Sequence, residues 1–171
     1  MHDTWTLSRR DLAKLGATAA GLPLFAAQAP AANSPEPLRS QFLMDLVLET
    51  APGAAAGSHN ITPVTGGTFE GPRLKGKVLG PGGDWTTRRP DGVIILDVRT
   101  TLETDDGQRI YTTYRGVIYR PQQQPSAATY WRTTPIFDTA APKYDWLNRI
   151  VAVGVRFDVP GKVAYHIYEI L

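Results

Sequence analysis

The sequence feature that most constrains the fold is a period-two alternation of apolar and polar residues. It runs from about residue 41 to the end of the chain and is interrupted by glycine-rich turns. Successive side chains of a strand point to opposite faces, so this texture predicts β-structure. Helical periodicity is missing, except for one turn expected at Lys143–Arg149. We expect strands over residues 42–50, 61–69, 74–79, 93–104, 108–119, 129–139, 150–159 and 163–170.

About eight strands in roughly 140 residues fold either as a sandwich or as a small closed barrel. We favour a single closed antiparallel β-barrel, because closure removes the exposed strand edges, and keep a β-sandwich as the alternative. A barrel of this size is filled by side chains or holds one small ligand. Two segments between strands are expected to be loops: APGAAAGSHN at residues 51–60 and GGDWTTRRPDG at residues 82–92.

The first part of the chain is predicted to be an export signal. Arg9 and Arg10 precede a leucine and a lysine in SRRDLAK, which resembles a twin-arginine motif, and small residues follow. The apolar run 15–27 is too short to span a bilayer, which needs about 20 residues, so no stable membrane anchor is expected. We therefore predict a signal with its cleavage region over 1–32, a linker over 33–40 and a barrel domain over 41–171. The protein is expected to be periplasmic or otherwise exported, and its precursor is expected to engage the twin-arginine export machinery.

Composition narrows the classes of function. The formal net charge is only +2 and the charges are scattered, which argues against a nucleic-acid partner. The chain has no cysteine, and His59 and His166 stand alone, so neither a disulfide nor a metal site is predicted. We expect no cofactor, whereas a small-molecule partner remains open.

The hairpin over residues 93–119 carries a polar face. Asp105-Asp106-Gly107 suits a three-residue turn closed by a left-handed glycine, and this turn places Asp97 opposite Arg115. One interpretation is that this face is exposed to solvent, where the pair is worth about half a kcal/mol. The other turns the face inward, so that Asp97, Tyr111 and Arg115 line a cavity and the buried charges must be paired.

Other candidate residues are aromatic or charged. Asp84-Trp85 lies in the expected loop, where a tryptophan either packs against the end of the core or contacts a ligand. Aromatic residues beside arginines elsewhere either form a ligand pocket or cap the barrel core. The candidate catalytic residues are Asp84, Asp97 and Tyr111, and the candidate ligand-binding residues are Trp85, Arg115, Arg132, Tyr144 and Trp146.

Four stretches together carry a family resemblance: GGTFEGPRLKGKVLGPGGDW (66–85), RPDGVIILDVRTTLETDDGQRIY (89–111), YWRTTPIFDT (130–139) and YDWLNRIVAVG (144–154). The chain resembles the bacterial family catalogued as domain of unknown function 3237, also called uncharacterised protein family 0311, over roughly residues 38–171. The resemblance implies a single compact β-barrel and says little about activity. The matching positions are Gly66, Gly67, Gly71, Asp84, Trp85, Asp91, Gly92, Asp97, Gly107, Tyr111, Arg132, Trp146, Leu147 and Asn148.

Three hypotheses for function follow. The first is an exported protein that binds a small, partly apolar or anionic molecule in or at the mouth of the barrel. The second is a cofactor-independent lyase, isomerase or hydratase, in which an aspartate is the general base and Tyr111 or an arginine stabilises an oxyanion. Burial beside Trp85 would raise the pKa of Asp84. The third is a structural or partner-binding module.

Overall fold

The computed structural model describes residues 35–121 and 128–171, and the domain in them is all-β. The predicted export signal (1–32) and residues 122–127 of the polar segment after Tyr119 lie outside the described residues. The elements are β1 (Ser40–Thr50), β2 (Ala54–Ala56), β3 (His59–Glu70), β4 (Lys75–Arg88), β5 (Ile94–Thr104), β6 (Arg109–Tyr119), β7 (Tyr130–Asp138), the 3-10 helix η2 (Pro142–Arg149), β8 (Ala152–Val159) and β9 (Lys162–Ile170).

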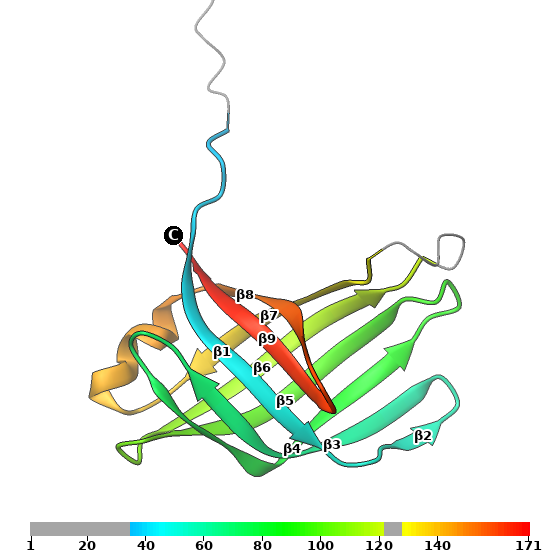
Figure 1. Ribbon diagram of the computed structural model, residues 1–171, viewed down its shortest axis with the longest axis horizontal. Helices are drawn as coiled ribbons and strands as arrows, with labels where there is room; N and C mark the ends of the chain where they lie inside the picture. The colour runs from blue at the N-terminus through cyan, green and yellow to red at the C-terminus, as the bar shows by residue number, and fades with distance from the viewer. Residues whose placement is uncertain (1–34, 122–127) are drawn as a thin grey trace, which may run out of the picture. The chain divides into compact units, whose positions relative to one another are not determined.

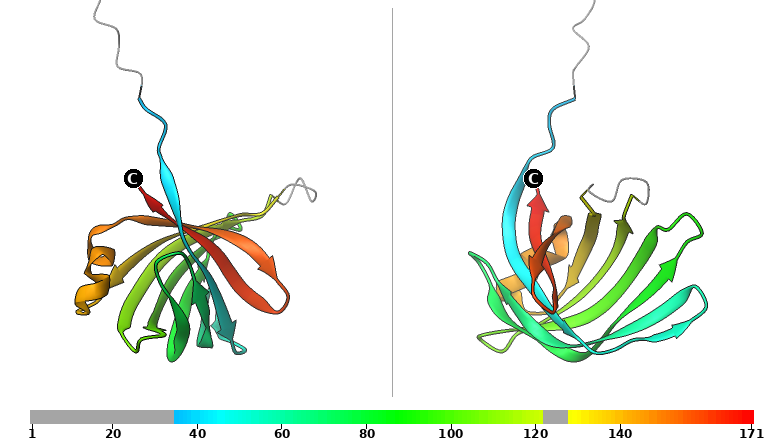
Figure 2. Two further views of the ribbon diagram at one scale, coloured as in Figure 1. Left: turned by 60° about the vertical axis from the view of Figure 1, so that its left-hand side comes forward. Right: turned by 45° about the vertical axis from the view of Figure 1, so that its right-hand side comes forward.

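The strands form one antiparallel sheet that closes on itself (Figure 1). Their order is β1-β9-β8-β7-β6-β5-β4-β3-β2, and β1 also pairs with β3, which joins the two ends of the sheet. Eight strands thereby make a closed barrel, and β2 is a short extra strand on β3. Figure 2 shows the strands curving around a common axis. The prediction of a closed antiparallel barrel of about eight strands is confirmed, and the loop predicted over residues 51–60 contains the unexpected β2.

The main difference from the sequence-based expectation is in β4. The chain was expected to leave the sheet after Leu79 and to form a loop over residues 82–92, but β4 continues to Arg88. Glycine and proline weaken strand propensity, which is why the sequence GGDWTTRRPDG over residues 82–92 is typical of a loop. Here the glycines serve a close approach instead, because a Cβ on Gly82 would lie 2.9 Å from the carbonyl oxygen of Arg99.

Strand β4 contains a bulge in this region. Leu79 pairs with Thr101 of β5 and Gly83 pairs with Arg99, so β4 has two extra residues in the interval. An even number of extra residues restores the alternation of faces after the bulge. Side chains at even positions, such as Asp84, therefore point to the same side of the sheet as Val78, which is buried in the core.

The β5–β6 hairpin has the predicted turn and register. The amide of Gly107 donates to the carbonyl oxygen of Thr104 at 2.8 Å, and Gly107 has the left-handed backbone (φ 79°) that a glycine adopts without strain. Asp97 pairs with Arg115 across the hairpin, as the three-residue turn requires. The turn therefore determines which residues of the two hairpin strands share a face.

One end of the barrel is closed by η2, which follows β7. Leu147 is fully buried among the core side chains, and the side-chain amide of Asn148 bonds both the amide and the carbonyl of Thr139, at 2.8 and 2.9 Å. These bonds attach η2 to the end of β7. The described residues contain no helix with the length and apolar composition needed to cross a bilayer.

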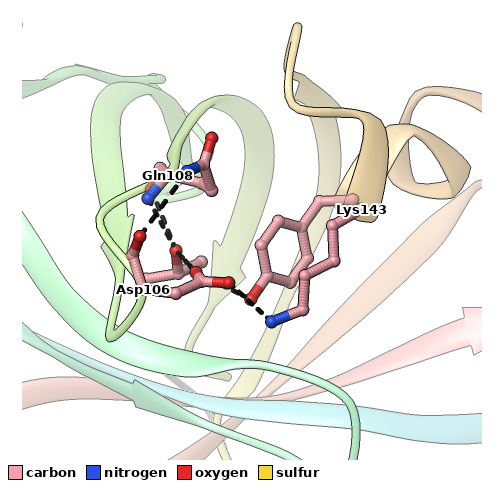
Figure 3. Close-up of polar contacts among 5 residues, drawn as sticks. Asp106, Gln108 and Lys143 are labelled. Atoms are coloured by element: carbon pink, nitrogen blue, oxygen red, sulfur yellow. Dashed lines mark hydrogen bonds and ion pairs between the residues drawn. The ribbon is translucent and has the colours of Figure 1, made fainter.

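A carboxylate in the β5–β6 turn holds the same end together (Figure 3). Asp106 accepts hydrogen bonds from Lys143 Nζ at 2.5 Å and Tyr144 Oη at 3.0 Å, both in η2, and from Thr104 Oγ1 at 2.5 Å. The hydrogen bond from Lys143, followed by that from Thr104, lowers the pKa of Asp106 to about 2. We call these four residues the Asp106 clamp.

Candidate functional site

A cavity opens into the other end of the barrel, away from η2. Its volume is about 210 Å³, and it is lined by the inner faces of seven barrel strands. This is below the lower end, about 300 Å³, of pockets that hold drug-sized ligands, so a smaller molecule fits best. The walls are mostly apolar, with a few polar groups that converge. The lining residues are Leu48, Thr50, Thr62, Val64, Asp84, Thr86, Ile94, Leu96, Tyr114, Ile118, Trp131, Val163 and Tyr165.

Asp84 is the ionisable carboxyl group in this lining. It lies on β4 beyond the bulge, and its Oδ1 accepts a hydrogen bond from the backbone amide of Asp97 at 3.3 Å. Burial in the apolar wall raises the pKa of Asp84 to about 6, the amide bond opposes this shift, and the negative charge of Asp97 adds to it. A carboxyl group with this pKa exchanges a proton readily near neutral pH, which suits a general acid or base.

Two buried tyrosines lie close to Asp84. The rings of Tyr114 and Tyr165 meet edge to face, with centroids 5.7 Å apart, and both side chains are almost fully buried. Burial raises the pKa of Tyr114 well above its ordinary value, and the charges of Tyr165 and Asp84 add to this effect. Burial likewise raises the pKa of Tyr165. Both hydroxyls therefore stay protonated and can donate a hydrogen bond.

Trp131 holds Tyr165 in place. The indole Nε1–H donates to the Tyr165 hydroxyl oxygen at 3.0 Å. An indole nitrogen can only donate, so Tyr165 accepts this bond and keeps its own proton for another acceptor. Such an oriented donor suits the stabilisation of an oxygen that becomes negative during a reaction.

Arg156 adds a positive charge beside these aromatic residues. It pairs with Tyr165 across the β8–β9 ladder, so both side chains lie on the inner face. Its guanidinium carbon lies 5.1 Å from the centroid of the Trp131 ring, a cation–π distance. The site therefore combines a carboxyl group, two hydroxyl donors and a guanidinium in one end of the barrel.

Four of the predicted site residues lie on the outer face of the sheet. Asp97 forms ion pairs with Arg115 at 3.3 Å and with Arg99 at 3.5 Å, and the Arg115 side chain is 74% exposed. Tyr111 is also exposed, and Arg132 stacks on the exposed ring of Tyr130. The alternative in which the polar hairpin face turns inward is wrong, because the closed barrel puts the apolar face of the hairpin inside.

Trp85 is also outside the barrel, although its neighbour Asp84 is inside. The side chain is 42% exposed and lies over Gly83, where a Cβ would be 3.0 Å from the ring, with the Arg99 guanidinium 5.4 Å from the ring centroid. Adjacent residues of a strand point to opposite faces, so Asp84 and Trp85 are separated. The apolar environment that raises the pKa of Asp84 is therefore the barrel interior and not Trp85.

The remaining two predicted ligand-binding residues lie at the opposite end of the barrel. Tyr144 is buried and donates to Asp106. Trp146 stacks under the guanidinium of Arg73, 3.7 Å from the ring centroid, and Arg73 also forms an ion pair with Glu169. Of all the predicted site residues, only Asp84 lines the cavity.

The sequence interpretation missed the residues that surround Asp84, namely Tyr114, Trp131, Arg156 and Tyr165. One signal was present, because Tyr114 is the tyrosine on the mostly apolar face of the predicted hairpin. Trp131, Arg156 and Tyr165 lie on the neighbouring strands β7, β8 and β9. Closure of the barrel brings these strands to the same end of the interior as Asp84 on β4, and no local pattern indicates that.

The comparisons with known proteins identify the family of the chain. A family model described as "Protein of unknown function (DUF3237)" matches residues 37–170. The chain belongs to this family. A UPF0311 protein from Rhodopseudomonas palustris is 30% identical over 125 residues, which cover 67% of this chain and 82% of that protein. The hydroalkoxylation enzyme phnH of Penicillium herquei is 32% identical over 127 residues, 71% of this chain and 76% of that enzyme.

Solved structures of similar proteins have the same fold. A beta-barrel-like protein from Acinetobacter baumannii superposes with a TM-score of 0.72 at 34% identity, covering 81% of this chain and 99% of that one. An enzyme from Penicillium herquei superposes with a TM-score of 0.64 at 27% identity, covering 81% and 98%. The DUF3237 barrel therefore occurs in proteins without an assigned activity and in at least one that is called an enzyme.

Proposed function

We propose that this DUF3237 protein is an enzyme with Asp84 as the general base. Inside the barrel it adds the oxygen and the proton of a substrate hydroxyl group to the two carbons of a carbon–carbon double bond. The observation that carries the proposal is the carboxyl group of Asp84, with a pKa of about 6, in an apolar cavity beside two protonated tyrosines. The name of the relative from Penicillium herquei supports this class of reaction.

The side chains supply what the reaction needs. The Asp84 carboxylate takes the proton of the substrate hydroxyl group while the hydroxyl oxygen bonds to one alkene carbon. The protonated Asp84 then returns the proton to the other alkene carbon. The product is an isomer of the substrate, and no electrons are gained or lost, so a redox cofactor is not needed. General-base catalysis of this kind contributes about 10²- to 10⁴-fold in rate.

The tyrosines indicate which alkene is suitable. If the double bond is conjugated to a carbonyl, negative charge moves onto the carbonyl oxygen as the hydroxyl adds. A hydroxyl donor that is already oriented, such as Tyr165 held by Trp131, stabilises that oxygen most in the transition state. We therefore expect a substrate in which a hydroxyl group and an enone lie in one small, mostly apolar molecule.

The test uses an ortho-hydroxyphenyl propenyl ketone, which closes to the isomeric methylchromanone. The wild-type protein is expected to accelerate closure, as followed by the loss of enone absorbance and by chromatography. Asp84→Asn should lower kcat by at least about 100-fold. Asp97→Asn is the matched control on the outer face and should keep near wild-type activity. Equal rates for the wild type and Asp84→Asn would exclude Asp84 as the base.

A binding protein without catalysis is the second candidate, because the cavity itself is its supporting observation. The two candidates differ in one result. A carrier binds the ketone and releases it unchanged, whereas an enzyme returns the chromanone. Export by the twin-arginine route, proposed from Arg9 and Arg10, applies to either candidate.

A further inference from the structure

Arg156 occupies an unusual position for a charged residue. It lies on the inner face of β8, opposite Tyr165 on β9, and only 19% of its side chain is exposed. The β7–β8 ladder has two residue pairs, Thr133 with Gly154 and Arg132 with Val155. Continued by one residue towards the cavity, the same register places Trp131 opposite Arg156. Trp131 and Tyr165 both line the cavity, and Arg156 lies beside both.

The contacts of Arg156 are long. Its two terminal nitrogens donate to the carbonyl oxygens of Ala164 and Lys162 at 3.4 Å each, and one lies 3.5 Å from Asp158 Oδ1. Good hydrogen bonds to oxygen are about 2.7–3.2 Å long. The side chain of Asp158 is fully exposed, so its carboxylate remains hydrated and stabilises the positive charge of Arg156 only weakly.

A surface arginine of the same chain shows the contrast. Arg149 forms two hydrogen bonds of 3.1 Å with the carboxylate of Asp145, a bidentate pair that satisfies its guanidinium. No contact of Arg156 among the described residues is as short. A mostly buried cation that lacks a close anion carries a desolvation cost, which a bound anion would offset.

We propose that Arg156 anchors a carboxylate on the substrate, while the apolar body of the same molecule enters the cavity beside Trp131 and Tyr165. The planar fork of a guanidinium matches two oxygen atoms, and the apolar walls, which include Leu96 and Ile118, suit an aromatic ring. The description of the ligand as a substrate rests on the proposed function, whereas the anion site does not.

The experiment compares probes of similar shape and different charge. Binding of naphthoate and of naphthamide is measured by calorimetry at about pH 7.5, where a carboxylic acid is ionised. Naphthoate is expected to bind the wild-type protein about 10- to 100-fold more tightly than naphthamide.

Variants assign the preference to Arg156. Arg156→Gln should bind naphthoate and naphthamide equally, and Arg156→Lys should keep part of the preference, because it keeps the charge without the fork. Asp158→Asn is the control and should bind naphthoate as well as or better than the wild type. Circular dichroism confirms the fold of each variant, and Arg156→Lys provides the comparison if Arg156→Gln does not fold.

The outcomes separate this proposal from the proposed function. A wild-type protein that does not prefer naphthoate, or an Arg156→Gln variant that keeps the preference, overturns the anion site whether or not the enone is cyclised. Asp84→Asn is expected to keep the preference for naphthoate. If it does and no enone is converted, the anion site stands and the proposed chemistry falls.

Discussion

The backbone amide of Asp97 donates a hydrogen bond to the carboxylate of Asp84, and the sheet separates the two side chains. Asp84 points into the cavity, whereas Asp97 points outward to Arg115. Two aspartates that the sequence presents as equal candidates therefore have different environments. Burial raises the pKa of the inner one, Asp84, and the first two predictions depend on this shift.

Asp84→Asn is expected to stabilise the protein at neutral pH but not in acid. The pKa of Asp84 is raised from 3.8 to about 6 in the folded state, so ionisation opposes folding as the pH rises through this window. After discounting for partial solvent exposure, the gain at pH 7 is about 1–2 kcal/mol, and it vanishes near pH 4. Urea unfolding at both pH values measures it. Asp97→Asn should show no such gain, because it loses the ion pair with Arg115.

The proposed activity is expected to rise with pH and level off. The base must be ionised, so kcat/KM should follow a single ionisation near pH 6 and reach a plateau above it. A stopped-flow pH profile with the hydroxyphenyl ketone tests this. Activity that falls between about pH 5 and pH 7 would mean that Asp84 acts as an acid, contrary to the proposal.

Tyr165→Phe is expected to destabilise the protein more than Tyr114→Phe. The first variant removes the acceptor of the Trp131 indole N–H, and an unsatisfied buried donor costs about 1–3 kcal/mol. Tyr114→Phe leaves no tryptophan without a partner. Urea unfolding of both variants measures the difference. Tyr165→Phe should also lower kcat more than it raises KM, since the donor acts on the transition state.

Asp106→Asn is expected to destabilise the barrel end closed by η2, and the effect should depend on pH. The pKa of Asp106 is lowered from 3.8 to about 2, chiefly by Lys143, so its stabilising effect is present above about pH 4 and is lost as the pH falls towards 2. Melting temperatures of the wild type and the variant should converge in that range. Asp105→Asn is the control in the same turn, because the Asp105 ion pair with Lys75 is exposed and contributes little.

Replacement of Arg9 and Arg10 by lysine is expected to keep the precursor inside the cell. In the proposed twin-arginine route the export machinery reads the paired arginines, and lysine keeps the charge but not the recognised side chain. Cell fractionation followed by immunoblotting measures the location. Equal amounts of mature protein outside the cytoplasm for the wild type and the double variant would contradict the proposed route.

Much of the fold was predictable because it depends on local patterns. Alternation located the barrel strands except for the second half of β4, and the turn at Asp105–Gly107 determined the register of the β5–β6 hairpin. The second half of β4 was missed because glycine and proline usually mark loops, whereas here Gly82 permits the close approach of β5.

The candidate site was mostly not predictable, for a physical reason. Asp84 was recognised as a candidate from its type and its place near a tryptophan, but which side of the sheet it faces depends on a bulge and on closure of the barrel.

The sequence by itself therefore determined most of the barrel strands, the main turn and the family resemblance, all of which depend on residues close together along the chain. Only the tertiary structure decided that Asp84 is inside and Trp85 outside, and that Tyr114, Trp131 and Tyr165 line one cavity with Arg156 beside it. Asp84 on β4 and Tyr165 on β9 face the same cavity because β1 pairs with β3 and closes the sheet, and the resulting burial raises the pKa values of Asp84 and Tyr114.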